Sequence, residues 1–209
     1  MLQFTRVEKS YGSAKILDIP SLELPPAIYW LQGPNGSGKT TLLRMLAGIL
    51  PFRGQIRLQG VSPKHDPVAY RRLIGWADAE PLYPEFLTGE DLLAFYRDII
   101  RPPAGQVEEL IDRLEVSSWL NMKVATWSAG ICKKMSLLLA FIGKPALITL
   151  DEPLVTLDPA GVTALHDLVL DRHYREGTGF ILSSHQPGLD DALPALRRLA
   201  AFDGSISLI

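Results

Sequence analysis

The sequence predicts an α/β fold in which buried strands of a sheet alternate with helices. Three apolar runs carry this prediction, because each has the length and composition of a buried strand. Ala27 to Leu31 leads into a glycine-rich loop, Ala146 to Leu150 into two acidic residues, and Phe180 to Ser184 into a histidine. Ligands of open α/β sheets bind at the carboxyl edge of the strands, so the residues that follow these runs are candidate site residues.

The first part of the chain is expected to be rich in strands, with one core helix. The strands expected here are Leu2 to Lys9, Ala27 to Leu31 and Gln55 to Leu58. Gly54 and Gly60 are expected to form the turns that bound the last strand. The core helix runs from about Lys39 to Ile49 and stops near Pro51. The Asp66-Pro67 pair predicts a further helix start, since it combines an N-cap with a favoured first-turn proline.

A helical insert is expected in the middle of the chain. Thr88 begins a helix that runs to about Ile100, where prolines end it, and the insert closes near Gly143. Its apolar residues recur at helical spacing, which is typical of a packed core rather than of a ligand site. These residues are Leu92, Phe95, Tyr96 and Ile99.

After the insert the chain is expected to return to the core. A helix from Pro159 to about Tyr174 separates the second and third apolar runs, and Asp203-Gly204 predicts a late hairpin. The 209 residues are therefore expected to form one domain. Residues 1–86 and 144–209 would make the core, and residues from about 87 to 143 the helical subdomain.

The glycine-rich loop fits the pattern G-x-x-x-x-G-K-[ST] and lies between a strand and a helix, which is the context of a phosphate-binding loop. Its candidate nucleotide-binding residues are Gly33, Asn35, Gly36, Ser37, Gly38, Lys39, Thr40 and Thr41. Lys39 can reach the β- and γ-phosphates, and the Thr40 hydroxyl can ligate Mg²⁺. The alternative is a glycine-rich turn with a surface lysine. The pattern and its context predict binding of a nucleoside triphosphate.

The second apolar run ends in Asp151 and Glu152. At this edge of the sheet Asp151 can hold Mg²⁺ opposite Thr40, as a Walker-B aspartate does. Glu152 is then placed to orient and deprotonate an attacking water. The alternative is an acidic turn that caps the next helix.

Three further motifs are weak when taken singly. Trp127 to Gly130 precedes an apolar helical stretch, Val155 to Pro159 follows Glu152, and His185 ends the third run. In this order and spacing, all five motifs resemble the nucleotide-binding subunit of ABC transporters, over essentially the whole chain. The resemblance implies a P-loop NTPase with a RecA-like core, an N-terminal antiparallel β layer and an inserted α-helical subdomain.

The resemblance also implies roles for further residues. Tyr11 matches the aromatic position that stacks on adenine, although simple packing in the N-terminal sheet is the alternative. Ser128 and Gly130 match the signature that contacts the γ-phosphate of ATP bound to the partner subunit. Asp158 matches the loop that crosses the dimer interface. His185 matches the histidine that touches the γ-phosphate, whereas a lone histidine at a strand end is more often a structural residue.

Two departures from the family pattern matter. The usual signature L-S-G-G-Q is altered at Trp127, Ala129 and Ile131, but Ser128, Gly130 and Lys134 retain the form S-x-G-x-x-x-K, a variant familiar in small export-type ATPases. The glutamine that normally completes the Mg²⁺ shell is replaced by Ala79.

Mg²⁺ keeps several waters and needs few protein ligands, so the loss of that glutamine is tolerable. Asp78 or Glu80 can compensate, directly or through water, and Asp78 is slightly favoured. Equally, both carboxylates can face solvent while water fills the shell.

Composition limits the class of protein. With 47% hydrophobic residues the chain can bury one core, and its formal net charge of −2 indicates no attraction to nucleic acid. The single cysteine, Cys132, excludes an internal disulfide. The first residues lack the features of a signal peptide, and no run reaches the roughly 18 apolar residues needed to span a membrane. Any membrane path is therefore expected to be another polypeptide.

The resemblance predicts an ATPase that uses ATP and Mg²⁺, forms a head-to-tail homodimer or heterodimer and energises transport, with export slightly favoured. Its partner would be an integral membrane subunit that contacts Tyr83 to Phe86. The expected location is cytoplasmic, on the inner face of the cell membrane. Two alternatives remain: a soluble ABC-type ATPase that acts on nucleic acid or ribosomes, and a non-hydrolysing scaffold with this fold. The transported substrate is not encoded in any motif found here.

Overall fold

The structure is a computed structural model that describes residues 1–184, 189 and 193–209. These residues form two sheets. One is antiparallel, with the order β2-β1-β4, and the other has the order β5-β6-β7-β3-β8-β9. The strands are β1 Leu2–Tyr11, β2 Ala14–Leu24, β3 Ile28–Gln32, β4 Arg53–Leu58, β5 Ile74–Ala77, β6 Leu147–Leu150, β7 Gly179–Ser183, β8 Leu196–Phe202 and β9 Ser205–Leu208. Within these described residues, no helix combines the length and the apolar character that crossing a membrane requires.

The larger sheet is parallel except at one edge, where β9 runs antiparallel to β8. The pairing brings Leu150 level with Leu182, and Leu31 level with Ser183. Because β3, β6 and β7 all point the same way, the residues that follow them meet at one edge of the sheet. The predicted α/β fold is therefore confirmed, and so is the hairpin at Asp203-Gly204, which joins β8 to β9.

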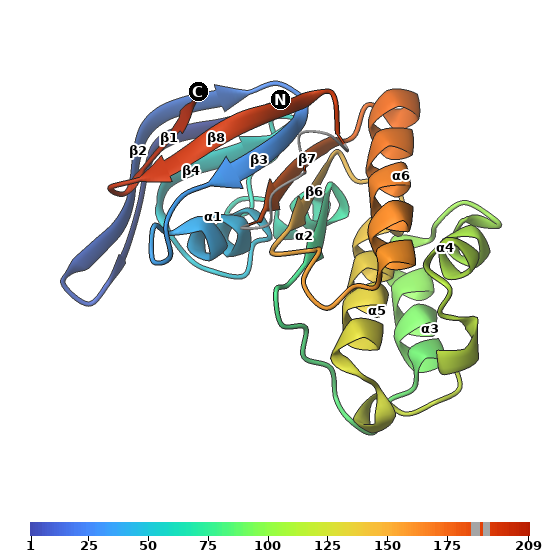
Figure 1. Cartoon of the computed structure of the whole chain (residues 1–209). Coiled ribbons are helices and arrows are strands. Elements are labelled where there is room, and N and C mark those ends of the chain that lie inside the picture. Colours follow the sequence, from blue (N-terminus) through green and yellow to red (C-terminus); the bar gives the residue numbers. More distant parts are fainter. Residues whose placement is uncertain (185–188, 190–192) are drawn as a thin grey trace.

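The helices divide between the core and the insert. They are α1 Lys39–Leu46, α2 Pro67–Arg72, α3 Gly89–Ile100, α4 Gln106–Leu114, α5 Ala129–Phe141 and α6 Pro159–Glu176, with short 3-10 turns at Ser117–Trp119 and Val124–Thr126. Helices α3, α4 and α5 gather away from the β1-β2-β4 sheet, with α6 alongside (Figure 1). One apolar cluster fills this helical part and one face of the larger sheet, and a second fills the space around α1 between the two sheets.

Several predicted boundaries were wrong. The first core helix ends at Leu46 rather than near Ile49, because Gly48 takes a left-handed conformation with φ of 71°. Helix α6 runs two residues beyond Tyr174. Strand β2 was not predicted, since its alternation is broken by charged residues and Pro20.

Two residues of the insert also differ from the sequence prediction. Leu92 is buried and Tyr96 packs on the cluster, as expected, but Phe95 is 61% exposed and Ile99 is 47% exposed. Helical spacing shows which side chains share a face of a helix, whereas burial depends on what covers that face. Here α3 leaves part of its apolar face uncovered.

Candidate functional site

The phosphate loop joins β3 to α1, and its shape depends on glycine at two positions. Gly38 is the N-cap of α1 and has φ of 92°, in the left-handed region that favours glycine. At Gly33 a Cβ atom would lie 2.2 Å from the carbonyl oxygen of Ala201 in β8. The loop therefore packs closely on the sheet, and the first turn of α1 presents its unpaired N–H groups beside it.

Lys39 is the first residue of α1, and its side chain folds back over the loop. Its Nζ donates to the carbonyl oxygen of Gly33 at 2.8 Å and to that of Pro34 at 3.1 Å. The residue is 8% exposed, so it is not a surface lysine. Burial lowers the pKa of Lys39, while the nearby carboxylates of Glu152 and Asp151 act in the opposite direction.

Asp151 follows β6 and is 1% exposed. Its Oδ1 accepts a hydrogen bond from the Ser183 hydroxyl at 2.5 Å. Its Oδ2 is buried and has no hydrogen-bond partner among the residues that the structure describes. A buried carboxylate oxygen without a donor is unfavourable unless something else meets it, and a cation is the natural complement of this charge. The side chain therefore fits a Mg²⁺ ligand.

Glu152 has a left-handed backbone, with φ of 44°, which is uncommon for a residue other than glycine. Its N–H donates to the Ser183 hydroxyl at 2.9 Å. Ser183 thus ties both acidic residues to the end of β7, and sequence reasoning assigned it no role. Its signal in the sequence is its place one residue before the end of the third apolar run.

Part of the sequence-predicted set meets in one pocket, whose lining also includes Ile16 and Val155. The predicted residues in this lining are Tyr11, Asn35, Gly36, Gly38, Lys39, Thr40, Thr41, Asp151 and Glu152. Tyr11 stands at its border with half of its side chain exposed, and Lys9 Nζ lies 4.9 Å from the centre of its ring. Gly33 and Ser37 belong to the loop but not to the lining, and the buried Ser37 hydroxyl has no hydrogen-bond partner in residues 1–184, 189 and 193–209. His185, which the sequence predicted for this site, lies outside the described residues.

Ser128, Gly130 and Asp158 do not line this pocket. Ser128 caps α5, where its hydroxyl accepts from the N–H of Ile131 at 3.3 Å. Asp158 caps α6, accepting from the N–H of Gly161 at 2.7 Å, and also pairs with Lys134 at 3.2 Å. Ser128 and Asp158 therefore have local structural roles within their own chain.

The loop after β5 corrects the expectation for Asp78. Both oxygens of its carboxylate lie 3.1 Å from Nη2 of Arg44, on the second turn of α1, and Asp78 does not line the nucleotide pocket. Ala79 and Glu80 do not line it either. The partner of this carboxylate is therefore Arg44, a neighbour that no sequence pattern indicated.

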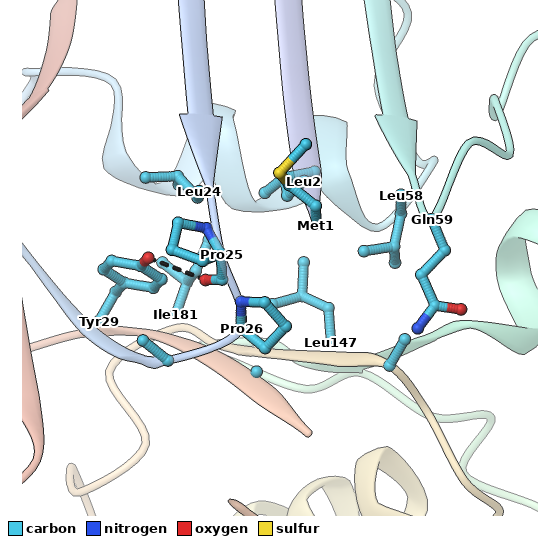
Figure 2. Close-up of a pocket in the computed structure, with 13 residues that line it drawn as sticks. Met1, Leu2, Leu24, Pro25, Pro26, Tyr29, Leu58, Gln59, Leu147 and Ile181 are labelled. Atoms are coloured by element: carbon cyan, nitrogen blue, oxygen red, sulfur yellow. Dashed lines mark hydrogen bonds between the residues drawn. The ribbon is translucent and has the colours of Figure 1, made fainter. Parts of the chain in front are cut away.

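An apolar pocket lies at the opposite end of the same sheet. It is formed around the amino ends of β3, β6 and β7, where Figure 2 shows Pro26, Leu147 and Ile181 beside the strand ends of the smaller sheet. The residues that line it carry no charged side chain. The Tyr29 hydroxyl donates to the carbonyl oxygen of Pro25 at 2.8 Å. This pocket does not suit phosphate, which leaves the loop edge as the candidate site.

Known proteins resemble this chain in both sequence and fold. The family model for "ABC transporter" matches residues 18–155. A Bacillus subtilis relative, "Uncharacterized ABC transporter ATP-binding protein YdbJ", is 30% identical over 88% of this chain and 61% of its own length. The "Nod factor export ATP-binding protein I" of Paraburkholderia xenovorans is 35% identical over 76% of this chain and 54% of its own length. The chain thus spans little more than half of these relatives.

Solved structures agree in fold. "Structure of ATP binding subunit of ABC transporter" superposes with a TM-score of 0.89 and 23% identity, covering 100% of this chain and 90% of that one. A dimeric cassette in a post-hydrolysis state, bound to ADP and phosphate, gives a TM-score of 0.82 at 18% identity, with 99% and 97% covered. With the phosphate loop and the acidic pair in one pocket, these matches identify the chain as a nucleotide-binding member of the ABC transporter family.

Proposed function

We propose that this protein hydrolyses ATP to energise transport through a separate membrane subunit. The observation that carries the proposal is the single pocket in which a phosphate loop faces Asp151 and Glu152. In such a site catalysis consists mainly of positioning and of neutralising charge on the transferred phosphoryl group. The names of the relatives, which pair ATP binding with transport, support the same function.

The chain supplies groups for each part of the substrate. The exposed ring of Tyr11 offers a face for adenine, and the loop N–H groups with the start of α1 receive the phosphates. Lys39, now bonded to carbonyls of its own loop, would turn its ammonium to the β- and γ-phosphates. Thr40 and Asp151 would hold Mg²⁺, which when bound neutralises charge on the phosphate oxygens.

Glu152 would orient the attacking water and accept its proton. It lies beside Asp151 in the pocket, and its backbone is held by Ser183. A positioned general base must lie within hydrogen-bond reach of the proton it takes, directly or through one water. His185 is proposed to help position this water, as the family resemblance implies.

A second subunit would complete the site. Ser128 and Gly130 lie at the start of α5, outside the chain's own pocket, and α5 leaves unpaired N–H groups at this end. We propose that they meet the γ-phosphate of ATP bound to the partner, with Asp158 at the interface. The dimeric solved structures with this fold support that assembly. The two subunits would be copies of this chain or of a related ATPase.

The membrane subunit is proposed to dock in a groove between the core and the helical insert. The groove is lined by residues of α2, β5, α3 and α5, including Arg71, Arg72, Trp76, Phe95 and Ile99. It accounts for the two exposed apolar residues of α3, because a docked apolar segment would cover them. Tyr83, by contrast, packs edge-to-face on Trp127, so within 83–86 only the residues after Tyr83 are well exposed.

We further propose export as the direction and the inner face of the cell membrane as the location. Support comes from the retained S-x-G-x-x-x-K signature and from the export protein among the relatives. A partner that is a nucleic acid or a ribosome would instead stimulate hydrolysis when RNA or DNA is added. The transported substrate would be set by the membrane subunit.

The direct test is ATP binding by Lys39→Ala, measured by titration with a fluorescent ATP analogue. A hydrogen bond to a charged group contributes about 1.5–3 kcal/mol, and each 1.4 kcal/mol is about tenfold in affinity, so the Kd should rise at least about tenfold. Lys144→Ala, at an exposed lysine outside the pocket, is the matched control and should bind like the native chain. Unchanged affinity in Lys39→Ala would remove the phosphate loop from the site.

A further inference from the structure

Lys133 is a buried lysine that the proposed function leaves unexplained. It lies in α5, only 1% exposed. Its Nζ donates to three backbone carbonyl oxygens: Asp78 at 2.9 Å, Ala79 at 2.6 Å and Glu152 at 3.3 Å. No carboxylate oxygen of a described residue is among these partners. An ammonium group has three N–H donors, so all three of its donors are used on two loops far apart in the sequence.

The position is costly for a charged group. Burial lowers the pKa of Lys133, and the negative charges of Asp151, Asp78 and Glu152 nearby act against that shift. An apolar side chain of similar length would fill the space without this cost but would remove a donor from all three carbonyl oxygens, of which that of Glu152 keeps the N–H of Val155. What the lysine adds is therefore a link between the loop after β5 and the loop after β6.

Glu152 is the residue that this link holds. Its left-handed backbone is fixed on one side by Ser183, which accepts from its N–H, and on the other by Lys133, which donates to its carbonyl oxygen. A strained backbone persists only when its surroundings over-determine it. The Val155 N–H donates to the same carbonyl oxygen, also at 3.3 Å. Lys133 is therefore the contact that joins this carbonyl group to α5 and to the loop after β5.

The same ammonium group also holds Asp78 and Ala79, which directly follow β5. Ile74, Gly75 and Trp76 of that strand line the groove proposed for the membrane subunit. The loop lacks the glutamine whose side chain joins this segment to the nucleotide site in the family pattern. Lys133 makes a connection between the same two regions from a different element.

We propose that Lys133 is a positioning residue that makes the orientation of Glu152 depend on the loop after β5. The inference rests on the proposed function, in which Glu152 is the general base. A displacement of β5 at the groove would be passed through one ammonium group to the backbone of Glu152. Hydrolysis would then respond to the membrane partner although Ala79 has no side-chain amide.

The test compares Lys133→Met with the native chain, with Lys133→Arg as the conservative variant and Lys144→Met as a surface control. Misplacing a catalytic group by about 1 Å costs on the order of 10²-fold in rate, so kcat should fall by roughly that factor in Lys133→Met. The Kd for ATP should stay native, because Lys133 does not line the pocket. The arginine variant should regain part of the rate, and Lys144→Met should behave as native.

Two further readouts separate positioning from simple damage. With slow hydrolysis, Lys133→Met should accumulate as an ATP-bound dimer on size exclusion, which a merely destabilised protein would not do. Amide exchange should rise together in residues 78–80 and 152–155, the two loops that the ammonium joins. If the methionine variant does not fold, Lys133→Leu, which also has no side-chain donor, replaces it with the same expected results.

Native kcat in the folded variant, or a fall in kcat matched by an equal loss of ATP binding, would overturn the proposal. The Glu152→Gln variant distinguishes a failure of the role proposed for Lys133 from a failure of the proposed function. If Glu152→Gln is slow and Lys133→Met is native, only the role of Lys133 fails. If Glu152→Gln hydrolyses ATP at the native rate, the assigned base fails and the role of Lys133 fails with it.

Discussion

At the scale of single residues, Asp151 carries the clearest chemical information. Its Oδ1 accepts from Ser183, whereas its buried Oδ2 has no hydrogen-bond partner within the described part of the chain. Leaving one buried polar group unpaired costs about 1–3 kcal/mol, and more for a charged group. A cation bound beside the phosphate loop would meet this oxygen, which is the physical reason to expect Mg²⁺ there.

This difference between Asp151 and Asp78 predicts the response to Mg²⁺. Asp78→Ala should leave the Mg²⁺ concentration for half-maximal hydrolysis unchanged, because its carboxylate is paired with Arg44. Asp151→Asn should raise that concentration, because it removes the negative charge that faces the metal. The measurement is a Mg²⁺ titration of the ATPase rate, with Glu80→Ala as the control carboxylate. A shifted midpoint in Asp78→Ala would return the loop after β5 to the metal site.

At the scale of elements, the groove of α2, β5, α3 and α5 is the part that binding to a membrane subunit should cover. Phe95→Glu places a charge on its exposed apolar wall and should prevent the membrane partner from co-purifying with the chain from native membranes. Tyr174→Glu, a similar change at an exposed residue on α6, should retain the partner. Retention by both variants, each with the native melting temperature, would show that the partner binds elsewhere.

Elements whose conformation is determined by adjacent residues could be predicted from the sequence. The loop from Gly33 to Thr41 carries its own conformation in its glycines, and its flanking strand and helix follow from adjacent residues. Strand β5 was not predicted, because Ile74–Ala77 is only four residues long and is defined by pairing with β6, far along the chain. The exposure of Phe95 depends in the same way on which elements surround α3.

The residues of the candidate site also differ in whether the sequence alone could reveal them. Lys39, Asp151 and Glu152 were found because their motifs are continuous in sequence, and the structure places them in one pocket. Their catalytic roles, and those of Tyr11 and the signature residues, stay predictions. Ser183, Arg44 and Lys133, by contrast, contact residues far along the chain, so no local pattern reveals them. The separation is 32 residues between Ser183 and Asp151, 34 between Arg44 and Asp78, and 19 between Lys133 and Glu152.

At the scale of the whole molecule, the site and the groove lie on different parts of the core, joined through β5 and the loops at its end. The chain's own pocket holds the phosphate loop and the acidic pair, whereas Ser128 and Gly130 lie outside it. Under the proposed function, the complete reaction needs two subunits around ATP and a membrane partner in the groove. Nucleotide-dependent closure of the dimer would be the two-state element that hydrolysis resets.

The central claim is that Glu152 is the base of a composite ATPase site, and the rate of Glu152→Gln tests it most directly. A general base contributes roughly 10²- to 10⁴-fold, so phosphate release with Mg²⁺ and ATP should slow by that factor while ATP affinity is kept. The same variant should elute as a dimer with ATP, and adding Ser128→Asp, which retains a capping side chain but opposes the γ-phosphate, should abolish that dimer. Phosphate release by Glu152→Gln at the native rate would contradict the account.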